Sequence, residues 1–176
     1  MSYFTNLDSK DLQIFPIHRI VKKFPINVTL LEPYFRIDKI KTKNDLMVLL
    51  ARAGQNEHSF GLIKKEGMYL LRLKSKTLID KVVKEGSKDY KSLDAAILKA
   101  FIFDQVGVAS EDIIYSKDPA EVITTVNEGQ ADAGFILNPV QINQLKAIAL
   151  NDERMPPKTT YFYPKVLSGL TMYKMD

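Results

Sequence analysis

Short apolar or alternating runs in the first half of the chain indicate strands. They cover residues 12–19, 34–40, 58–65 and 68–74. Between the last two runs, Glu66 is followed by Gly67, and glycine supplies the positive φ that a tight turn requires. Residues 58–74 are therefore predicted to form a β-hairpin.

Helical spacing of apolar residues accounts for most of the remaining chain. Thr42 has the features of a helix N-cap, and Gly54 has those of a helix end. Asp118 precedes Pro119, a pair typical of a helix start, and Ser92 is expected to cap a longer helix. The predicted helices cover residues 42–54, 77–85, 92–102, 118–127 and 138–150.

Two further strands, at residues 113–115 and 133–137, flank the predicted helix at 118–127. This strand–helix–strand order indicates a crossover unit. Residues 161–173 supply terminal strand material. The predicted fold class is α+β, a mixed α/β domain with a largely antiparallel sheet packed by about five helices.

Length and composition favour a single domain over residues 1–176. A chain of 176 residues with 45% hydrophobic content can bury most of the surface that its unfolded form exposes. The absence of cysteine excludes disulfides, thiolate catalysis and Cys-based metal sites. No run approaches the roughly 18 apolar residues that cross a bilayer, and the amino terminus has no leader-like pattern. We therefore expect a cytoplasmic protein without a membrane partner.

Charge is distributed unevenly along the chain. The first 90 residues hold 17 Lys and Arg against 10 Asp and Glu, and the remainder holds 8 against 11. A basic half can attract phosphate or nucleic acid. The charges are spread out and seldom interleave with aromatic residues, so a solvated basic face is the favoured interpretation. Nucleic-acid binding is the minority hypothesis.

Residues 155–170 concentrate hydrogen-bond donors between prolines. Lysine ammonium groups are point-charge donors to phosphate or carboxylate, and hydroxyls and phenols add neutral hydrogen bonds. The alternative is structural: the prolines fix a turn, Tyr161 and Tyr163 share one face of a strand, and Gly169 allows close packing. If the segment binds a small anionic ligand, the predicted ligand-binding residues are Lys158, Thr159, Thr160, Tyr161, Tyr163 and Lys165.

The segment Phe15-Pro16-Ile17-His18-Arg19 holds a second group of candidates. His18 is a weak catalytic candidate as a proton carrier near neutral pH, and Arg19 is a candidate bidentate ligand for an anion. On a strand these two side chains point to opposite faces, so at most one addresses a given pocket. The alternative is a hydrogen-bonded histidine at a sheet edge beside a solvated or paired arginine. His58 has no motif around it and is interpreted as an ordinary strand residue.

Familiar cofactor motifs do not occur. Two histidines and no cysteine cannot supply a His-Glu-x-x-His or Cys-rich zinc site, so no metal is expected. The sequence has no Gly-x-Gly-x-x-Gly, P-loop or Gly-x-Ser-x-Gly arrangement. No cofactor is therefore expected from a recognisable motif.

The two donor-rich segments together resemble the carboxyl-terminal half of a prokaryotic family, domain of unknown function 1015. The family signature Met-Pro-x-Lys-Ser/Thr-Thr-Tyr-Phe-x-Pro-Lys, followed by Gly-Leu, matches residues 155–170. Its second signature, usually Pro-Thr-His-Arg, is Pro16-Ile17-His18-Arg19 in this chain. Ile17 thus replaces a hydroxyl, while the histidine and the arginine remain.

The resemblance implies that the chain is the carboxyl-terminal half of a longer architecture. The relatives carry an amino-terminal half with an Asp-Gly-His-His-Arg-like signature, similar to ParB-type nucleotide-binding and free-serine-kinase proteins, and this chain has no such motif. The chain is then a non-catalytic or half-site module that presents an anionic-ligand surface to the amino-terminal half. Nucleotide binding and phosphotransfer would belong to the full-length protein. The alternative is an interaction domain that docks on the amino-terminal half or forms a homodimer.

Overall fold

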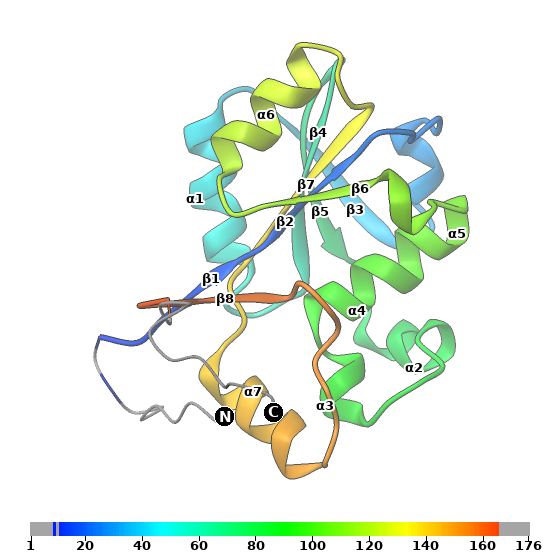
Figure 1. The fold of residues 1–176 in the computed structure, drawn as a ribbon. Helices are drawn as coiled ribbons and strands as arrows, with labels where there is room; N and C mark the ends of the chain where they lie inside the picture. The colour runs from blue at the N-terminus through cyan, green and yellow to red at the C-terminus, as the bar shows by residue number, and fades with distance from the viewer. Residues whose placement is uncertain (1–8, 10, 166–176) are drawn as a thin grey trace, which may run out of the picture.

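The computed structural model describes residues 9 and 11–165 and is built around a six-stranded sheet (Figure 1). The strand order is β3-β5-β4-β7-β2-β6, and every neighbouring pair is antiparallel. This confirms the predicted α+β class with a largely antiparallel sheet. The strands are β2 (His18–Val21), β3 (Phe35–Ile40), β4 (Ser59–Lys64), β5 (Gly67–Leu73), β6 (Ile113–Ser116) and β7 (Ala133–Leu137).

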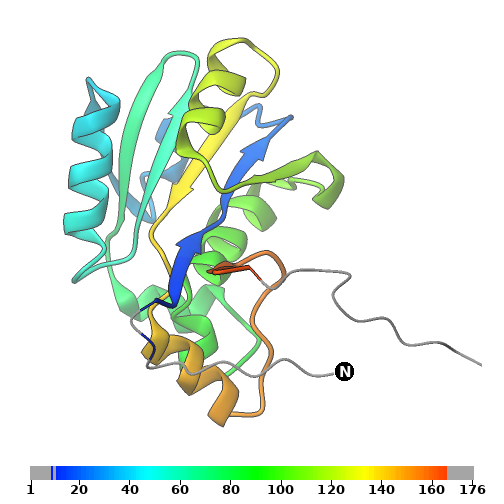
Figure 2. The same ribbon diagram turned by 60° about the vertical axis from the view of Figure 1, so that its left-hand side comes forward.

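One face of the sheet is covered by α1 (Lys43–Ala53) and α6 (Pro119–Asn127), which are seen on either side of the β4–β5 hairpin in Figure 2. Their inward residues pack with sheet residues in one apolar cluster because they recur at helical spacing. The helical members of this cluster are Leu46, Leu50, Val122 and Val126.

The opposite face carries the larger apolar cluster, in which edge-to-face aromatic pairs are prominent. Two short 3-10 helices, Val28–Leu31 and Lys76–Leu78, cover part of this face. The rest is covered by α-helices, two of which are joined by a π-helical stretch. The α-helices on this face are α2 (Ile79–Val82), α4 (Asp94–Leu98) and α5 (Asp104–Val106), with the π-helical stretch Lys99–Phe103 between the last two.

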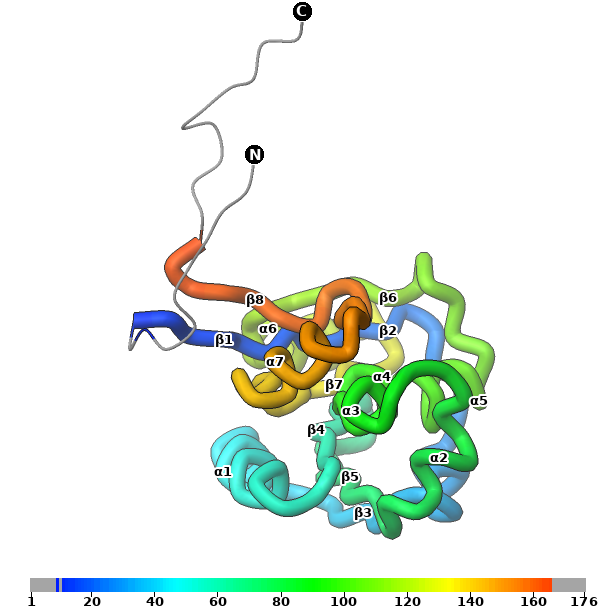
Figure 3. The backbone as a smooth tube through the Cα atoms, turned by 90° about the horizontal axis from the view of Figure 1, so that it is seen from below, coloured from blue at the N-terminus to red at the C-terminus, as the bar shows by residue number. Residues whose placement is uncertain are grey.

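Two further helices, α3 (Lys88–Lys91) and α7 (Ile142–Leu150), lie together at one end of the molecule (Figure 1). A small cluster of Leu93, Ala96 and Ile148 joins them to α4. Beside this end, β1 (Gln13–Pro16) and β8 (Thr160–Tyr163) form a separate two-stranded antiparallel sheet. Figure 3 shows these two strands running side by side.

Local signals in the sequence explain the best-predicted elements. The hydroxyl of Thr42 accepts the backbone N–H of Asp45 at 3.1 Å, as an N-cap does. The carboxylate of Asp118 likewise accepts the backbone N–H of Ala120 at 2.8 Å. The crossover is confirmed as well: β6 and β7 both run antiparallel to β2, which lies between them, so they are parallel to each other.

Several predicted boundaries were wrong. The hairpin turns at residues 65–66, and Gly67, with φ 149, is already the first residue of β5. Ser92 ends α3 instead of capping the next helix, whose N-cap residue, Leu93, offers no side-chain cap. The helix expected from residue 138 begins at Ile142.

The last predicted strand is confirmed only in part, because β8 ends at Tyr163 and residues 166–176 lie outside the described part of the chain. Gly169, to which a packing role was given, is among them. No helix within the described residues is both long enough and apolar enough to span a membrane.

Candidate functional site

The pairing of β1 with β8 brings the two donor-rich segments onto one surface. Phe15 lies opposite Tyr161 in the register, and Pro16 lies opposite Thr160. These positions are far apart in the sequence, so neither segment alone defines the surface. The site is built from both ends of the described chain.

A hollow of about 370 Å³ lies between this strand pair and the connection from β6 to α6. The ring of Phe15 contacts those of Tyr161 and Tyr163, with centroids 6.5 and 6.4 Å apart. The ammonium of Lys117 lies 4.9 Å from the centroid of the Tyr161 ring, a cation–π contact. Gln13, Asp118 and Pro119 complete the lining. The hollow thus combines aromatic walls with one cation, Lys117, and one carboxylate, Asp118.

The predicted residues of the terminal segment differ in their exposure. Lys158 and Lys165 are exposed at the two ends of β8, and Tyr163 is 53% exposed. Thr160 and Tyr161 are half-buried. Thr159 is buried, and its hydroxyl donates to the backbone carbonyl of Pro156 at 2.5 Å. That hydrogen bond fixes the turn before the strand and leaves Thr159 with little access to a ligand.

His18 lies in the core, and its side chain is 2% exposed. Its Nδ1 accepts the backbone N–H of Leu137 at 3.2 Å, so the ring is neutral with its proton on Nε2. Burial, and secondarily the charge of Arg19, lowers the pKa of His18 from 6.5 to about 4, against an opposing effect of Asp118. His18 is therefore uncharged at neutral pH.

Arg19 is also buried, with 5% of its surface exposed. Its guanidinium donates to the carbonyl of Ile17 and lies 4.8 Å from the centroid of the Tyr115 ring. Burial lowers the pKa of Arg19 to about 10, although Tyr115 opposes the shift. No carboxylate of the described residues lies within ion-pair distance of this guanidinium.

His18 and Arg19 were expected to point to opposite faces of the sheet, and the packing of the residues that follow them agrees with this. Ile20, which shares a face with His18, belongs to the cluster under α1 and α6. Val21, which shares a face with Arg19, belongs to the cluster on the other side. The structure does not bring these two side chains to the aromatic hollow, whose lining includes neither.

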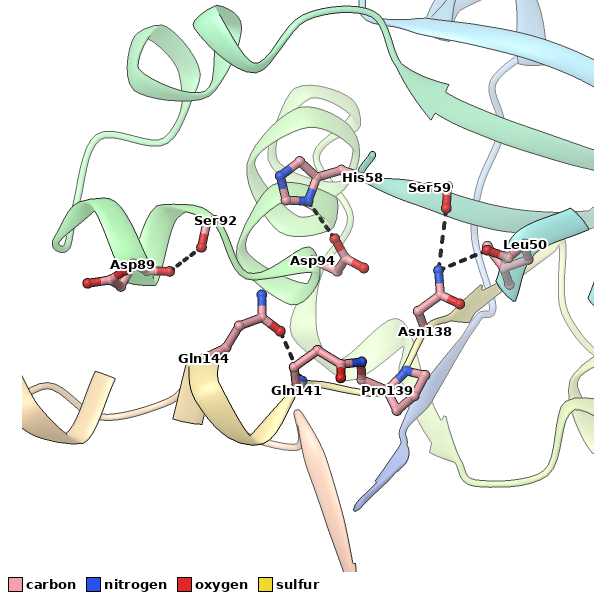
Figure 4. Close-up of polar contacts among 10 residues, drawn as sticks. All are labelled: Leu50, His58, Ser59, Asp89, Ser92, Asp94, Asn138, Pro139, Gln141 and Gln144. Atoms are coloured by element: carbon pink, nitrogen blue, oxygen red, sulfur yellow. Dashed lines mark hydrogen bonds and ion pairs between the residues drawn. The ribbon is translucent and has the colours of Figure 1, made fainter. Parts of the chain in front are cut away.

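Two features of the structure have no counterpart in the sequence-based prediction. Lys117 reaches Tyr161 only because β6 and β8 fold close together, and no local signal encodes that contact. His58 precedes β4, and its Nδ1 lies 2.8 Å from Oδ1 of Asp94, the first residue of α4 (Figure 4). His58 therefore lies one residue outside the strand to which it was assigned, and its side chain has a partner on another element.

Basic residues of the first half are partly used within the fold. Lys64 donates to the carbonyl of Ile26 at 2.6 Å, and Arg72 pairs with Asp38 at 2.7 Å. Within residues 9 and 11–165, no group of three or more His, Asp or Glu side chains is close enough to hold a metal ion.

These features define an α+β protein whose surface carries an aromatic hollow beside lysines. The chain belongs to the family described as "Protein of unknown function (DUF1015)", whose model matches residues 1–96. The matched region includes Phe15–Arg19 but not the terminal segment. No curated protein matches the sequence.

Solved structures similar to this chain include free serine kinases with bound nucleotide. A free serine kinase mutant in complex with ADP is 16% identical with a TM-score of 0.55, and the alignment covers 92% of this chain and 58% of that one. A second mutant, in complex with AMP, is 13% identical with a TM-score of 0.53, covering 90% and 57%. A conserved hypothetical protein from Pyrococcus furiosus is 13% identical with a TM-score of 0.51, covering 90% and 59%. At such identities the likeness shows the fold, and the chain spans less than two thirds of each neighbour.

Proposed function

We propose that the chain is a ligand-presenting half of a longer DUF1015 protein, and that its β1–β8 surface binds an anionic, nucleotide-type ligand. On this proposal the chain is the carboxyl-terminal half, and an amino-terminal half supplies the remaining wall of the site together with any phosphotransfer. The chain itself contributes binding groups. The proposal joins the terminal segment and the strand that ends at Pro16 into one functional surface.

The observation that carries the proposal is the aromatic hollow with Lys117 at its edge. Aromatic rings stack on nucleobases, and each such contact contributes about 1–3 kcal/mol. Lysine ammonium groups are suited to phosphate oxygens. Phe15, Tyr161 and Tyr163 supply the rings, while Lys117 supplies a cation between them and the start of α6.

Two further observations support a nucleotide over a simple anion. Lys158 and Lys165 are exposed at either end of β8, where they can extend a positive field over the hollow. The two free serine kinase structures described above are complexes with ADP and AMP. Those ligands belong to the neighbours, and their extension to this chain is part of the proposal.

The test is calorimetric titration of the chain with ADP, AMP and inorganic phosphate. Tyr161→Leu removes the ring and is expected to weaken ADP binding about five- to 150-fold, the equivalent of about 1–3 kcal/mol. Tyr161→Phe is the matched control, because it keeps the ring and loses only the hydroxyl. Lys117→Ala should weaken both nucleotides, whereas Lys84→Ala, an exposed lysine elsewhere on the surface, should not.

The same variants in the full-length protein separate two outcomes. If nucleotide binds only to the full-length protein and Tyr161→Leu weakens it there, the surface is a half-site. If the substitution leaves nucleotide affinity unchanged in both proteins, the β1–β8 surface is not the ligand site and the proposal fails.

A second candidate function, docking on another protein domain, is favoured by exposed apolar side chains on β1 and on the edge strand β6. Phe15 is 41% exposed, and Ile114 and Tyr115 on the edge strand β6 are 40% and 41% exposed. An edge strand with exposed apolar residues is suited to pairing with a partner. Mixing the chain with a separately purified amino-terminal half, followed by size exclusion with light scattering, tests this. Elution of the two parts as separate species would argue against docking, and a dimer of the chain alone would indicate self-association.

A further inference from the structure

A second hollow, of about 640 Å³, lies away from the β1–β8 surface and is lined mainly by polar side chains. Its walls come from the connection between α1 and β4, the first residue of α4, and the connection between β7 and α7 (Figure 4). The lining includes His58 and Asp94, which face each other there. Nothing in the aromatic surface described above uses these residues.

His58 is held in one tautomer by Asp94. An ionised carboxylate can only accept hydrogen bonds, so the 2.8 Å contact requires that Nδ1 of His58 carries the proton and donates it to Oδ1 of Asp94. The two side chains are 15% and 22% exposed, which favours the contact over competing water. In the neutral ring Nε2 is then the acceptor nitrogen, and it has no hydrogen-bond partner among the described residues. An oriented histidine of this kind is ready to accept a hydroxyl proton.

The wall opposite α4 is fixed by Asn138. Its side-chain NH₂ donates to the carbonyl of Leu50 at 3.2 Å and to the hydroxyl of Ser59 at 3.3 Å (Figure 4). Gly54 makes room for this amide, because a Cβ at that position would lie 2.2 Å from Nδ2 of Asn138. Both amide hydrogens are used within the fold, so the carbonyl oxygen Oδ1 remains to accept from a ligand.

The rest of the lining adds amide donors and acceptors, one cation and one further carboxylate, Glu57, which lies 3.8 Å from the guanidinium of Arg36 and 3.7 Å from that of Arg72. Gln141 and Gln144 begin α7, where Oε1 of Gln144 accepts the backbone N–H of Gln141 at 3.0 Å and its NH₂ remains a donor. Lys76 is exposed at the rim and has no ion-pair partner among the described residues. Groups that both donate and accept suit hydroxyls, and an unpaired lysine suits a phosphate or carboxylate.

We infer that this hollow is a second ligand site, which binds a small hydroxylated anion. The ligand hydroxyl donates to Nε2 of His58, which Asp94 orients, and the anionic group binds Lys76. Asn138 and the glutamines of α7 bind the remaining hydroxyls. The inference is independent of nucleotide binding at the β1–β8 surface.

The first test reads the tautomer of His58 without any ligand. Long-range ¹H–¹⁵N spectra resolve the ring nitrogens, and the chain has only two histidines. The wild-type spectrum should show Nδ1 of His58 protonated and Nε2 unprotonated. Asp94→Asn should abolish that preference, because a neutral amide can donate as well as accept. A wild-type ring protonated on Nε2 would overturn the inference.

The second test adds ligand probes. Glycerol 3-phosphate and glycerate carry both hydroxyl and anion, glycerol carries only hydroxyls, and acetate and inorganic phosphate carry only the charge. The first two should shift Nε2 of His58 and leave the buried His18 unchanged, and their relative affinities distinguish phosphate from carboxylate. His58→Gln and Lys76→Ala should each weaken binding about ten-fold, as the loss of one good hydrogen bond does.

Lys74→Ala is the matched control for the lysine, because Lys74 is exposed nearby and does not line the hollow. Thermal unfolding of each variant separates a folding defect from a loss of binding. Probes that leave the His58 nitrogens unshifted at millimolar concentration overturn the proposal, as does unchanged affinity in folded His58→Gln. Neither result would bear on nucleotide binding at the aromatic surface.

Discussion

Acidification is expected to destabilise the fold through His18. Burial lowers the pKa of this histidine in the folded protein from 6.5 to about 4, with a second contribution from Arg19. In the unfolded chain the ring is free to take up a proton near its ordinary pKa. Between these values the unfolded state therefore binds more protons than the folded state. The contribution of His18 to the free energy of unfolding is fully present above pH 6.5 and is lost as the pH falls towards 4.

The expected loss of stability follows from the size of the pKa shift of His18. A fall from 6.5 to about 4, at about 1.36 kcal/mol per unit, corresponds to about 3 kcal/mol of unfolding free energy. The slope approaches about 1.4 kcal/mol per pH unit near pH 5, where the two states differ by almost one bound proton. For a chain of this size such a loss lowers the melting temperature by about 6–12 °C.

The assay is urea unfolding of the wild type and of His18→Gln at pH 7, 5.5 and 4.5. Glutamine can still accept the backbone N–H of Leu137 but does not titrate, so its stability should change less with pH. Carboxylates titrate in both proteins, so their effect on stability cancels in the difference between wild type and His18→Gln. His58→Gln is the control, since it removes the other histidine. The reasoning is refuted if the stability difference between wild type and His18→Gln stays constant with pH.

Three further outcomes are expected from thermal or urea unfolding. Gly134→Ala should cost about 1–3 kcal/mol, because its Cβ would lie 2.3 Å from Cγ1 of Val122. Val122→Ala should relieve part of that cost in the double variant. If the stability losses of the two single variants simply add in the double variant, the clash is contradicted. Asp118→Ala should cost about 1 kcal/mol through the lost helix cap, and Asp118→Ser should recover most of it. Arg19→Met should change stability by less than about 1 kcal/mol, because this buried charge has no carboxylate partner; a loss above about 3 kcal/mol would show that the contact with Tyr115 is strongly stabilising.

The elements predicted well are those whose signals are local. Thr42 and Asp118 each bond a backbone N–H within three residues, so the sequence window that contains the cap also contains its partner. The boundary at residue 138 was missed for the opposite reason. Asn138 is of a residue type that often begins helices. Its side chain, however, donates hydrogen bonds to Leu50 and Ser59, which are distant in the sequence. Long-range contacts of this kind outweigh a local propensity.

The candidate site was predictable as residues but not as a surface. Tyr161 is a predicted ligand-binding residue, and Phe15 directly precedes the second signature. Their pairing, however, depends on two strands at opposite ends of the described chain. His58 was passed over because Asp94, which gives it an orientation, follows 36 residues later on another element. Strand pairing and side-chain partners across such separations are set by tertiary packing.

The break at Ile17 explains why the segment Phe15–Arg19 has two roles. The single strand predicted over residues 12–19 divides there, and β1 pairs with β8 while β2 enters the main sheet. Phe15 is thereby placed at the aromatic hollow, and His18 becomes part of the core. A substitution of Phe15 should thus change ligand binding with little loss of stability. A substitution of His18 should change stability first, and any effect on binding should follow from that loss.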